Sequence, residues 1–118
     1  MAQPVYSRRL WGDHVPNGTV EIYVPEGKLW IVRDMDAYAN VSSTGQVDLY
    51  VIDRLSGATV WWTKYIETQQ ETRQWRGRQV FHYSQGQGGI IIQNIGSHAV
   101  DLFMSGYELS DPSALPAP

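Results

Sequence analysis

Cysteine is absent from the 118 residues of this sequence. Disulfide bonds and thiolate metal sites are therefore excluded, although this alone does not fix the redox compartment. The sequence also lacks an apolar run as long as a membrane span, and its N-terminus lacks the apolar core of a signal peptide. We therefore expect no membrane insertion. A chain of this length buries enough surface to fold as one domain without covalent cross-links.

Charged residues are also scarce, at 18% of the chain against the roughly one quarter that is typical of globular domains. Nine Lys and Arg against twelve Asp and Glu give a net charge of −3, which argues against a nucleic-acid partner. Aromatic residues are plentiful, with five Trp and seven Tyr. Few charges and many aromatic side chains indicate that part of the surface contacts other protein.

Alternating polar and apolar residues, rich in β-branched and aromatic types, predict about eight strands and no helix. The expected strands cover residues 19–24, 29–38, 47–53, 59–66, 73–83, 89–95 and 99–109, with 5–11 as either an edge strand or an arm laid on a neighbour. We expect turns at residues 11–18, 55–58 and 84–89, and loops at 41–46 and 67–72. The fold class is therefore all-β, a sandwich or a barrel.

The stretch Val24–Tyr38 organises the chain in this interpretation. Pro25 suits the second position of a tight turn, and Gly27 can take the positive φ that closes it, so we predict a hairpin of residues 19–24 with the strand from Leu29. Regular alternation divides that strand into two largely apolar faces. One face carries Leu29, Ile31, Arg33, Met35 and Ala37, and the other carries Trp30, Val32, Asp34, Asp36 and Tyr38. A strand that is apolar on both faces indicates assembly. A second hairpin is predicted about residues 96–98.

The expected organisation is one sandwich domain with extended arms at both ends. Residues 1–18 form an N-terminal arm and turn, residues 19–109 the β-sandwich, and residues 110–118 a Pro-rich C-terminal arm. Proline cannot continue a strand and favours extended geometry. We expect the C-terminal arm to be a strap held by another subunit.

The sequence contains no pattern typical of an enzyme or a metal site. Its three histidines lie in three separate segments, and it has no nucleophile elbow and no phosphate-binding loop before a helix. Asp34 and Asp36 share one strand face, but calcium would require more oxygen ligands and a glycine-rich turn between them. Pairing of these carboxylates with arginine side chains like Arg33 across an interface is the favoured interpretation. We expect no catalytic residues, no cofactor and no metal.

The sharpest charged feature is the stretch from Arg73 to Arg78. Arg73, Arg76 and Arg78 surround Trp75 and would suit either a stacking platform for phosphate or single-stranded nucleic acid, or a protein–protein hot spot. The net acidity of the chain favours the protein interface.

Trp61 and Trp62 should point to opposite faces of one strand because side chains alternate. One of them is expected in the core. The other would stack on a sugar or lie in an oligomer contact, and the sequence does not separate these two uses. The candidate interface or ligand residues are Trp30, Arg33, Trp61, Trp62, Arg73, Trp75, Arg76 and Arg78.

Four stretches carry a resemblance to a known family. They are Ser-Arg-Arg-Leu-Trp-Gly-Asp at residues 7–13, Val-Pro-Glu-Gly-Lys-Leu-Trp-Ile-Val-Arg-Asp at 24–34, Trp-Arg-Gly-Arg-Gln-Val at 75–80, and Ser-Gly-Tyr-Glu-Leu at 105–109. Together they resemble small virion proteins of tailed bacteriophages that infect actinobacteria, such as mycobacteriophages, which are commonly labelled minor tail proteins. The resemblance implies a jelly-roll-like sandwich present in several copies near the tail tip, without a cofactor.

We therefore expect a non-enzymatic structural component of a phage virion. It would oligomerise, with a trimer favoured, and would pack on other virion proteins through its arms. The alternatives are a capsid decoration protein and a carbohydrate-binding module that attaches to host cell-surface glycan.

Overall fold

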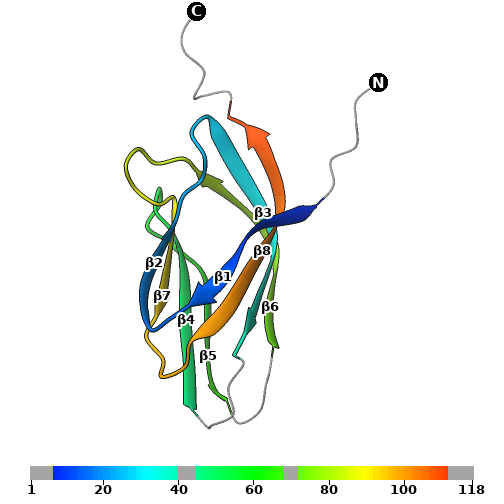
Figure 1. The fold of residues 1–118 in the computed structure, drawn as a ribbon. Coiled ribbons are helices and arrows are strands. Elements are labelled where there is room, and N and C mark those ends of the chain that lie inside the picture. The colour runs from blue at the N-terminus through cyan, green and yellow to red at the C-terminus, as the bar shows by residue number, and fades with distance from the viewer. Residues whose placement is uncertain (1–6, 40–44, 68–71, 112–118) are drawn as a thin grey trace, which may run out of the picture.

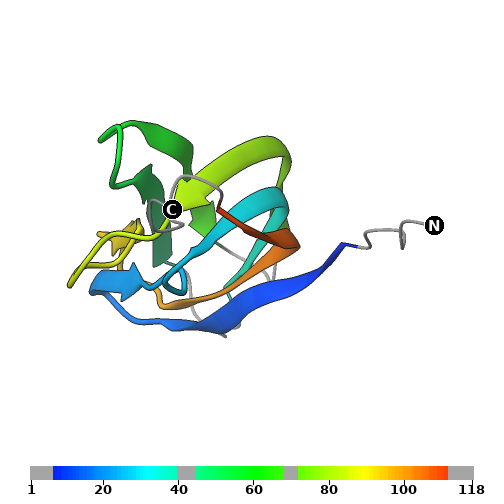
Figure 2. The same cartoon turned by 90° about the horizontal axis from the view of Figure 1, so that it is seen from above.

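The computed structural model describes residues 7–39, 45–67 and 72–111 of the chain. These residues form eight strands: β1 (Arg8–Val15), β2 (Gly18–Ile22), β3 (Lys28–Tyr38), β4 (Gly45–Asp53), β5 (Thr59–Glu67), β6 (Thr72–His82), β7 (Ile90–Asn94) and β8 (Val100–Ser110). One four-stranded sheet, here called sheet A, has the order β1-β8-β3-β6, and the other, sheet B, has the order β2-β7-β4-β5. The two sheets pack face to face (Figures 1 and 2).

The predicted all-β sandwich is confirmed, because all pairings are antiparallel and no helix occurs in the described ranges. The alternating residues of each sheet explain the core between the sheets. In β4, Val47, Leu49 and Val51 are buried, while Tyr50 and Ile52 on the outer face are half-buried. No helix among the described residues is long and apolar enough to cross a membrane.

The predicted hairpins are wrong, because their strands belong to different sheets. β2 pairs with β7 in sheet B, whereas β3 pairs with β6 and β8 in sheet A. The same separation holds for β7 and β8. Alternation predicts that a segment is a strand but not which strand lies beside it. Connections of about five residues are long enough to cross the roughly 10 Å between two packed sheets.

The turn before β3 contains the predicted positive φ, which is 76° at Gly27. The Lys28 N–H donates to the Pro25 carbonyl oxygen at 3.1 Å, so Pro25 opens the turn and does not occupy its second position as predicted. The Asp111 N–H donates to the Gly27 carbonyl oxygen at 2.9 Å. This turn is therefore tied to the end of β8.

The predicted turn at residues 11–18 is wrong for residues 11–15, since the chain remains extended to Val15 and pairs with β8, whereas residues 16 and 17 do connect β1 to β2. Gly12 and Asp13 resemble turn residues, but an edge strand tolerates both. Residues 8–15 of the expected N-terminal arm therefore belong to sheet A, and Ser110 of the expected C-terminal arm belongs to β8. Arm residues 1–6 and 112–118, which include most of the predicted strap, lie outside the described residues.

A line of register shifts crosses sheet A at one level. One shift lies between Arg9 and Trp11 where β1 pairs with β8, and another lies between Val32 and Asp34 where β3 pairs with both β8 and β6. In the pairing with β8, Arg33 is the additional residue of β3, whereas in the pairing with β6 both Gly77 and Arg78 lie opposite Arg33. Arg33 interrupts the alternation of β3.

The bulge at Arg33 corrects the predicted faces of this strand. Trp30 and Val32 before it, and Met35 and Ala37 after it, all point into the core, with exposed fractions of 5% or less. Regular alternation had placed these two pairs on opposite faces.

Candidate functional site

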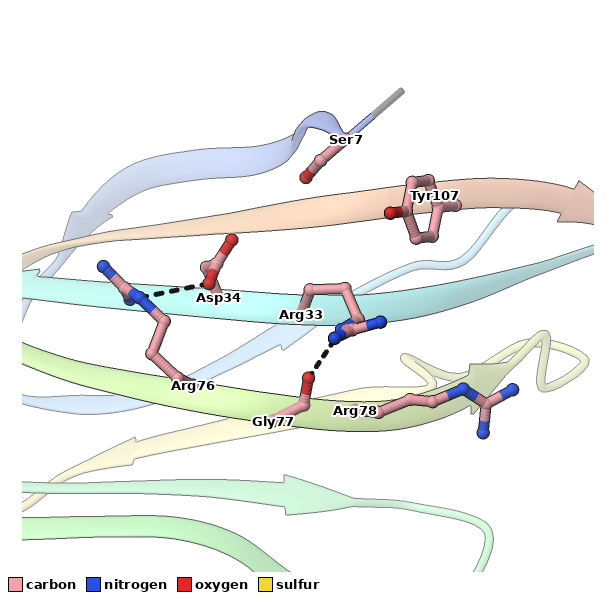
Figure 3. A pocket seen from close by; sticks show the side chains of 7 residues that line it. All are labelled: Ser7, Arg33, Asp34, Arg76, Gly77, Arg78 and Tyr107. Atoms are coloured by element: carbon pink, nitrogen blue, oxygen red, sulfur yellow. Dashed lines mark hydrogen bonds and ion pairs between the residues drawn. The ribbon is translucent and has the colours of Figure 1, made fainter. Parts of the chain in front are cut away.

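A groove of about 600 Å³ lies on the outer face of sheet A, at the level of the bulges. It is lined by Ser7, Arg33, Asp34, Arg76, Gly77, Arg78 and Tyr107. Figure 3 shows β3 running between β8 on one side and β6 on the other. We call this surface the Arg33 groove. Bulges can re-aim side chains near functional sites, and the groove lies at the level of the register shifts.

Arg33 lies at the centre of the groove and is exposed. Its Nε donates to the Gly77 carbonyl oxygen at 2.8 Å (Figure 3). This is the one contact of the Arg33 side chain with the described part of the chain. The bond orients the guanidinium and leaves both Nη groups as donors for a partner. A guanidinium offers these donors as a planar fork that matches a carboxylate.

Arg76 is already neutralised by two carboxylates of β3. Its Nε lies 3.1 Å from Asp34 Oδ1, and its Nη1 lies 3.4 Å from Asp36 Oδ1. These aspartates do pair with an arginine, but the expected pairing across an interface is not what the structure shows, because Arg76 belongs to the neighbouring strand of the same sheet. Their carboxylates therefore do not form an open cation site.

The groove is net positive. Three arginines and one aspartate line it, and Arg78 makes no ion pair with any residue that the structure describes. The hydroxyl groups of Ser7 and Tyr107 lie on the side opposite Arg78. These groups are hydrogen-bond donors beside two available arginines, so the chemistry of the groove suits an anionic group carried by a partner.

The other predicted contact residues of sheet A lie outside the groove. Trp30 is 5% exposed, and its Nε1 donates to Glu108 Oε2 at 2.9 Å. The expectation that Trp30 is a surface contact is therefore wrong, because Trp30 lies on the core face of β3 and its indole N–H is bonded within sheet A. Trp75 is half-buried against the core, and a Cβ added at Gly77 would come within 2.8 Å of its ring.

The arginines of β6 do not form a platform around Trp75. The Arg73 guanidinium carbon lies 4.2 Å from the centre of the Tyr65 ring, whereas Arg76 contacts the aspartates of β3. Arg73 pairs with the buried Ala37, and Arg76 pairs with Asp34. Arg73 therefore lies on the inner face of sheet A and Arg76 on its outer face. The stacking platform around Trp75 that the sequence suggests for phosphate or single-stranded nucleic acid is therefore not formed.

Trp61 and Trp62 do point to opposite faces of β5, as predicted. Trp61 is half-buried against the core, whereas Trp62 is 54% exposed on the outer face of sheet B. The Trp62 ring stacks on Tyr50, with centroids 5.6 Å apart and an angle of 11° between the planes. Its Nε1 donates to Asp48 Oδ1 at 2.9 Å. These contacts hold the indole in one orientation.

The described ranges contain no group of three metal-ligating side chains. His14 Nδ1 lies 3.0 Å from Asp101 Oδ1, and His82 Nδ1 lies 3.4 Å from Asp111 Oδ2. These two histidines lie at separate places in the fold.

Sequence reasoning missed Ser7, Gly77 and Tyr107 as members of a site. An isolated glycine within a strand pattern often marks a bulge, so Gly77 between Arg76 and Arg78 is a sequence feature that indicates an irregularity at the groove. Ser7 and Tyr107 carry no such signal, because strand pairing alone brings them to the groove.

Neither a protein-family model nor a curated protein matches this sequence. The structure nevertheless brings together the four stretches on which the resemblance rests. They contribute to β1, β3, β6 and β8, which are the four strands of sheet A. All seven residues of the Arg33 groove also fall within these stretches.

The Arg76 contacts should contribute little to stability. We expect Arg76→Ala to lower the free energy of unfolding by less than about 1 kcal/mol, because exposed ion pairs are screened by water. The Arg76 side chain is 52% exposed. Urea denaturation measures this, with Arg78→Ala as a matched control that removes no ion pair. A loss above about 2 kcal/mol for Arg76→Ala would mean that the groove residues serve the fold.

Proposed function

We propose that this chain is a non-enzymatic structural component of a phage virion, most specifically a minor tail protein that packs on other virion proteins. The observation that carries the proposal is that the four stretches on which the resemblance rests lie side by side in sheet A. These stretches are far apart in the sequence. They nevertheless contribute to all four strands of sheet A and contain every residue that lines the Arg33 groove. Fold alone does not imply function, so the proposal rests on this site.

The sandwich is proposed to be a jelly roll. The support is the strand order, β1-β8-β3-β6 against β2-β7-β4-β5, in which early and late strands alternate within each sheet. An eight-stranded chain folded as two Greek keys has such an order. Jelly rolls include viral capsid and lectin domains, which agrees with a virion protein and with the carbohydrate-binding alternative.

The Arg33 groove is the proposed contact with a neighbouring virion protein. Arg33 and Arg78 supply available cationic groups on an open surface, and arginine is enriched in protein–protein hot spots. A carboxylate-bearing segment of the neighbour satisfies both arginines. The non-enzymatic assignment has support in the lining, since its one carboxylate is already paired with Arg76.

The experiment that tests this function locates the chain in the virion. Particles of a phage that encodes the chain are purified, analysed by mass spectrometry and labelled with gold-conjugated antibodies against the purified protein. We expect the peptides in intact particles and the gold at the tail tip. Gold over the capsid surface would support the decoration protein instead, and particles without the chain would refute a structural role.

A carbohydrate-binding host-adhesion module is the second candidate. The observation that favours it is the exposed, orientationally fixed indole of Trp62 beside the Asp48 carboxylate, an arrangement that suits stacking on a sugar ring. Titration of solubilised host cell-wall fragments against tryptophan fluorescence tests it. Binding that is lost in Trp62→Ala and kept in Ile66→Ala supports this candidate, and no fluorescence change in the unmodified protein excludes it.

A further inference from the structure

The sandwich has four edge strands, and one of them has a long segment with few of the features that normally prevent edge-to-edge pairing. The edges are β1 and β6 in sheet A and β2 and β5 in sheet B. An edge strand presents unpaired backbone N–H and C=O groups, and proteins protect such edges with bulges, charges, shortness or inward-pointing charged residues. The four edges can be compared on these criteria.

Three edges are protected. β1 contains the bulge at Leu10 and carries Arg8 and Arg9. β6 has a register shift with β3 at Gly77 and Arg78, and it carries three arginines, of which Arg73 points toward the inner face. β2 is only five residues long. Each of these features disfavours a further strand.

β5 differs from the other edges. It is nine residues long, and its register with β4 is regular from Trp61 to its end. Lys64 is its one charged residue before the terminal Glu67. On its outer face, Trp62 and Ile66 are 54% and 60% exposed. A long and regular edge with exposed apolar side chains is a template for another strand.

We propose that β5 pairs antiparallel with β5 of a second copy of this chain, about a two-fold axis at Thr63. The two sheets B then form one continuous sheet. This inference names the contact through which the proposed virion protein self-associates, so its biological role rests on that proposal. The pairing itself is a property of the purified chain and is tested separately.

The side chains select the axis. Directly opposed residues in an antiparallel pair share a face, so the outer-face residues must meet one another. An axis at Lys64 would oppose two like charges, which is unfavourable. An axis at Trp62 would oppose only Trp61–Thr63 as regular strand in both copies, because β5 is irregular at Val60.

An axis at Thr63 keeps the two Lys64 side chains from opposing each other and pairs the regular residues Trp61–Tyr65 of both copies. It places Lys64 of each copy against Trp62 of the other, which allows a cation–π contact. On the inner face it places Trp61 against Tyr65, a favourable cross-strand aromatic pair.

A two-fold contact produces a dimer, which replaces the trimer as the self-association that we propose. A closed ring of three requires two different surfaces on each copy. The other edges carry the protective features described above, so β5 matches best with itself.

The test is a single cysteine at the axis. The chain has no cysteine, so Thr63→Cys introduces its one thiol. Opposed Cα atoms in an antiparallel pair lie about 4.5–5.5 Å apart, within the roughly 4.4–6.8 Å that a disulfide spans. Under mild oxidation we expect most of the Thr63→Cys protein to run as a covalent dimer on a non-reducing gel and as a monomer after reduction.

Two matched variants test the register and the edge. Lys64→Cys is one residue away and should stay unlinked, because Trp62 and not Lys64 of the other copy lies opposite. Thr19→Cys places a thiol on the β2 edge and should also stay unlinked. Linking of Lys64→Cys in preference to Thr63→Cys would overturn the register.

Sedimentation of the unmodified chain provides an independent measurement. We expect twice the 13.4 kDa mass of the chain. A single species at the chain mass, together with no linking of Thr63→Cys, would overturn the pairing and leave the virion role untouched. It would also leave Trp62 available for the carbohydrate-binding alternative.

Discussion

Replacing Gly106 with alanine is expected to destabilise the sandwich more than any other single-methyl addition to sheet A. Gly106 is on β8 at the bulge level, opposite Val32 of the central strand β3. A Cβ at this position would overlap the carbonyl oxygen of Ile31. That oxygen belongs to the backbone of a strand paired on both sides, so neither strand can move away alone. We expect a loss of about 3 kcal/mol or more, which lowers Tm by about 10 °C.

Ser105→Ala is the matched control for Gly106→Ala. Ser105 precedes Gly106 in β8 and is half-exposed on the outer face, so its change should stay within about 0.5 kcal/mol. Thermal unfolding followed by circular dichroism compares the two variants. If Gly106→Ala melts within one degree of the unmodified protein, the close contact between β3 and β8 at the bulge is not as described.

The second large effect is expected at Asn94, a fully buried polar residue at the end of β7. Its Nδ2 donates to the carbonyl oxygens of Val15 at 3.2 Å and His98 at 2.9 Å. Its Oδ1 accepts from the Gly96 N–H at 3.2 Å. The side chain therefore joins the end of β1 to the connection between β7 and β8. Asn94→Leu preserves volume but leaves three backbone groups without this partner, and we expect a loss of about 3 kcal/mol or more.

Two controls separate the Asn94 hydrogen bonds from general disturbance of β7. Gln93→Leu changes the exposed neighbouring residue and should alter stability by less than about 0.5 kcal/mol. Asn17→Ala removes only the outer bonds, from Asn17 Nδ2 to the Asn94 and Gly96 carbonyl oxygens, and should cost about 1 kcal/mol. Urea denaturation measures the free energy of unfolding of each variant. Equal losses for Asn94→Leu and Gln93→Leu would contradict the structural role of this network.

The sequence was sufficient to predict most of the strands, because alternation is a local property. Val47, Leu49 and Val51 of β4 show this, since each points into the core as their spacing predicts. Pairing partners are not local, so β2 and β3 were assigned to a hairpin although they lie in different sheets. A turn containing proline and glycine suits either arrangement.

The bulge at Arg33 limited the prediction of side-chain direction. One additional residue changes which later positions face the core, and nothing in the types of residues 32–34 fixes its position. For this reason Met35 and Ala37 were predicted to lie on the face opposite Trp30 and Val32, whereas all four are buried. The groove lies at the level of the same bulge, so Arg33, Arg76 and Arg78 were identified as contact residues without the reason that brings them together.

The two proposed surfaces lie on different sheets and are compatible with each other. The Arg33 groove is on the outer face of sheet A, and β5 is an edge of sheet B. A dimer formed through β5 therefore leaves both grooves available to neighbouring virion proteins. Such a dimer presents two copies of the groove, which strengthens attachment through multivalency.

The central claim is that the Arg33 groove attaches this chain to the virion. The most direct measurement is the amount of chain incorporated into particles when the variant Arg78→Glu replaces the unmodified protein, quantified by mass spectrometry of purified particles. Arg78 makes no ion pair within the described residues, so the fold should be preserved. Lys28→Glu is the control, because it makes the same change of charge away from the groove lining.

We predict that Arg78→Glu lowers incorporation about tenfold or more, since reversing a charge at a complementary contact costs several kcal/mol. Lys28→Glu should be incorporated at the level of the unmodified protein. Equal incorporation of both variants, with both folded, would contradict the account.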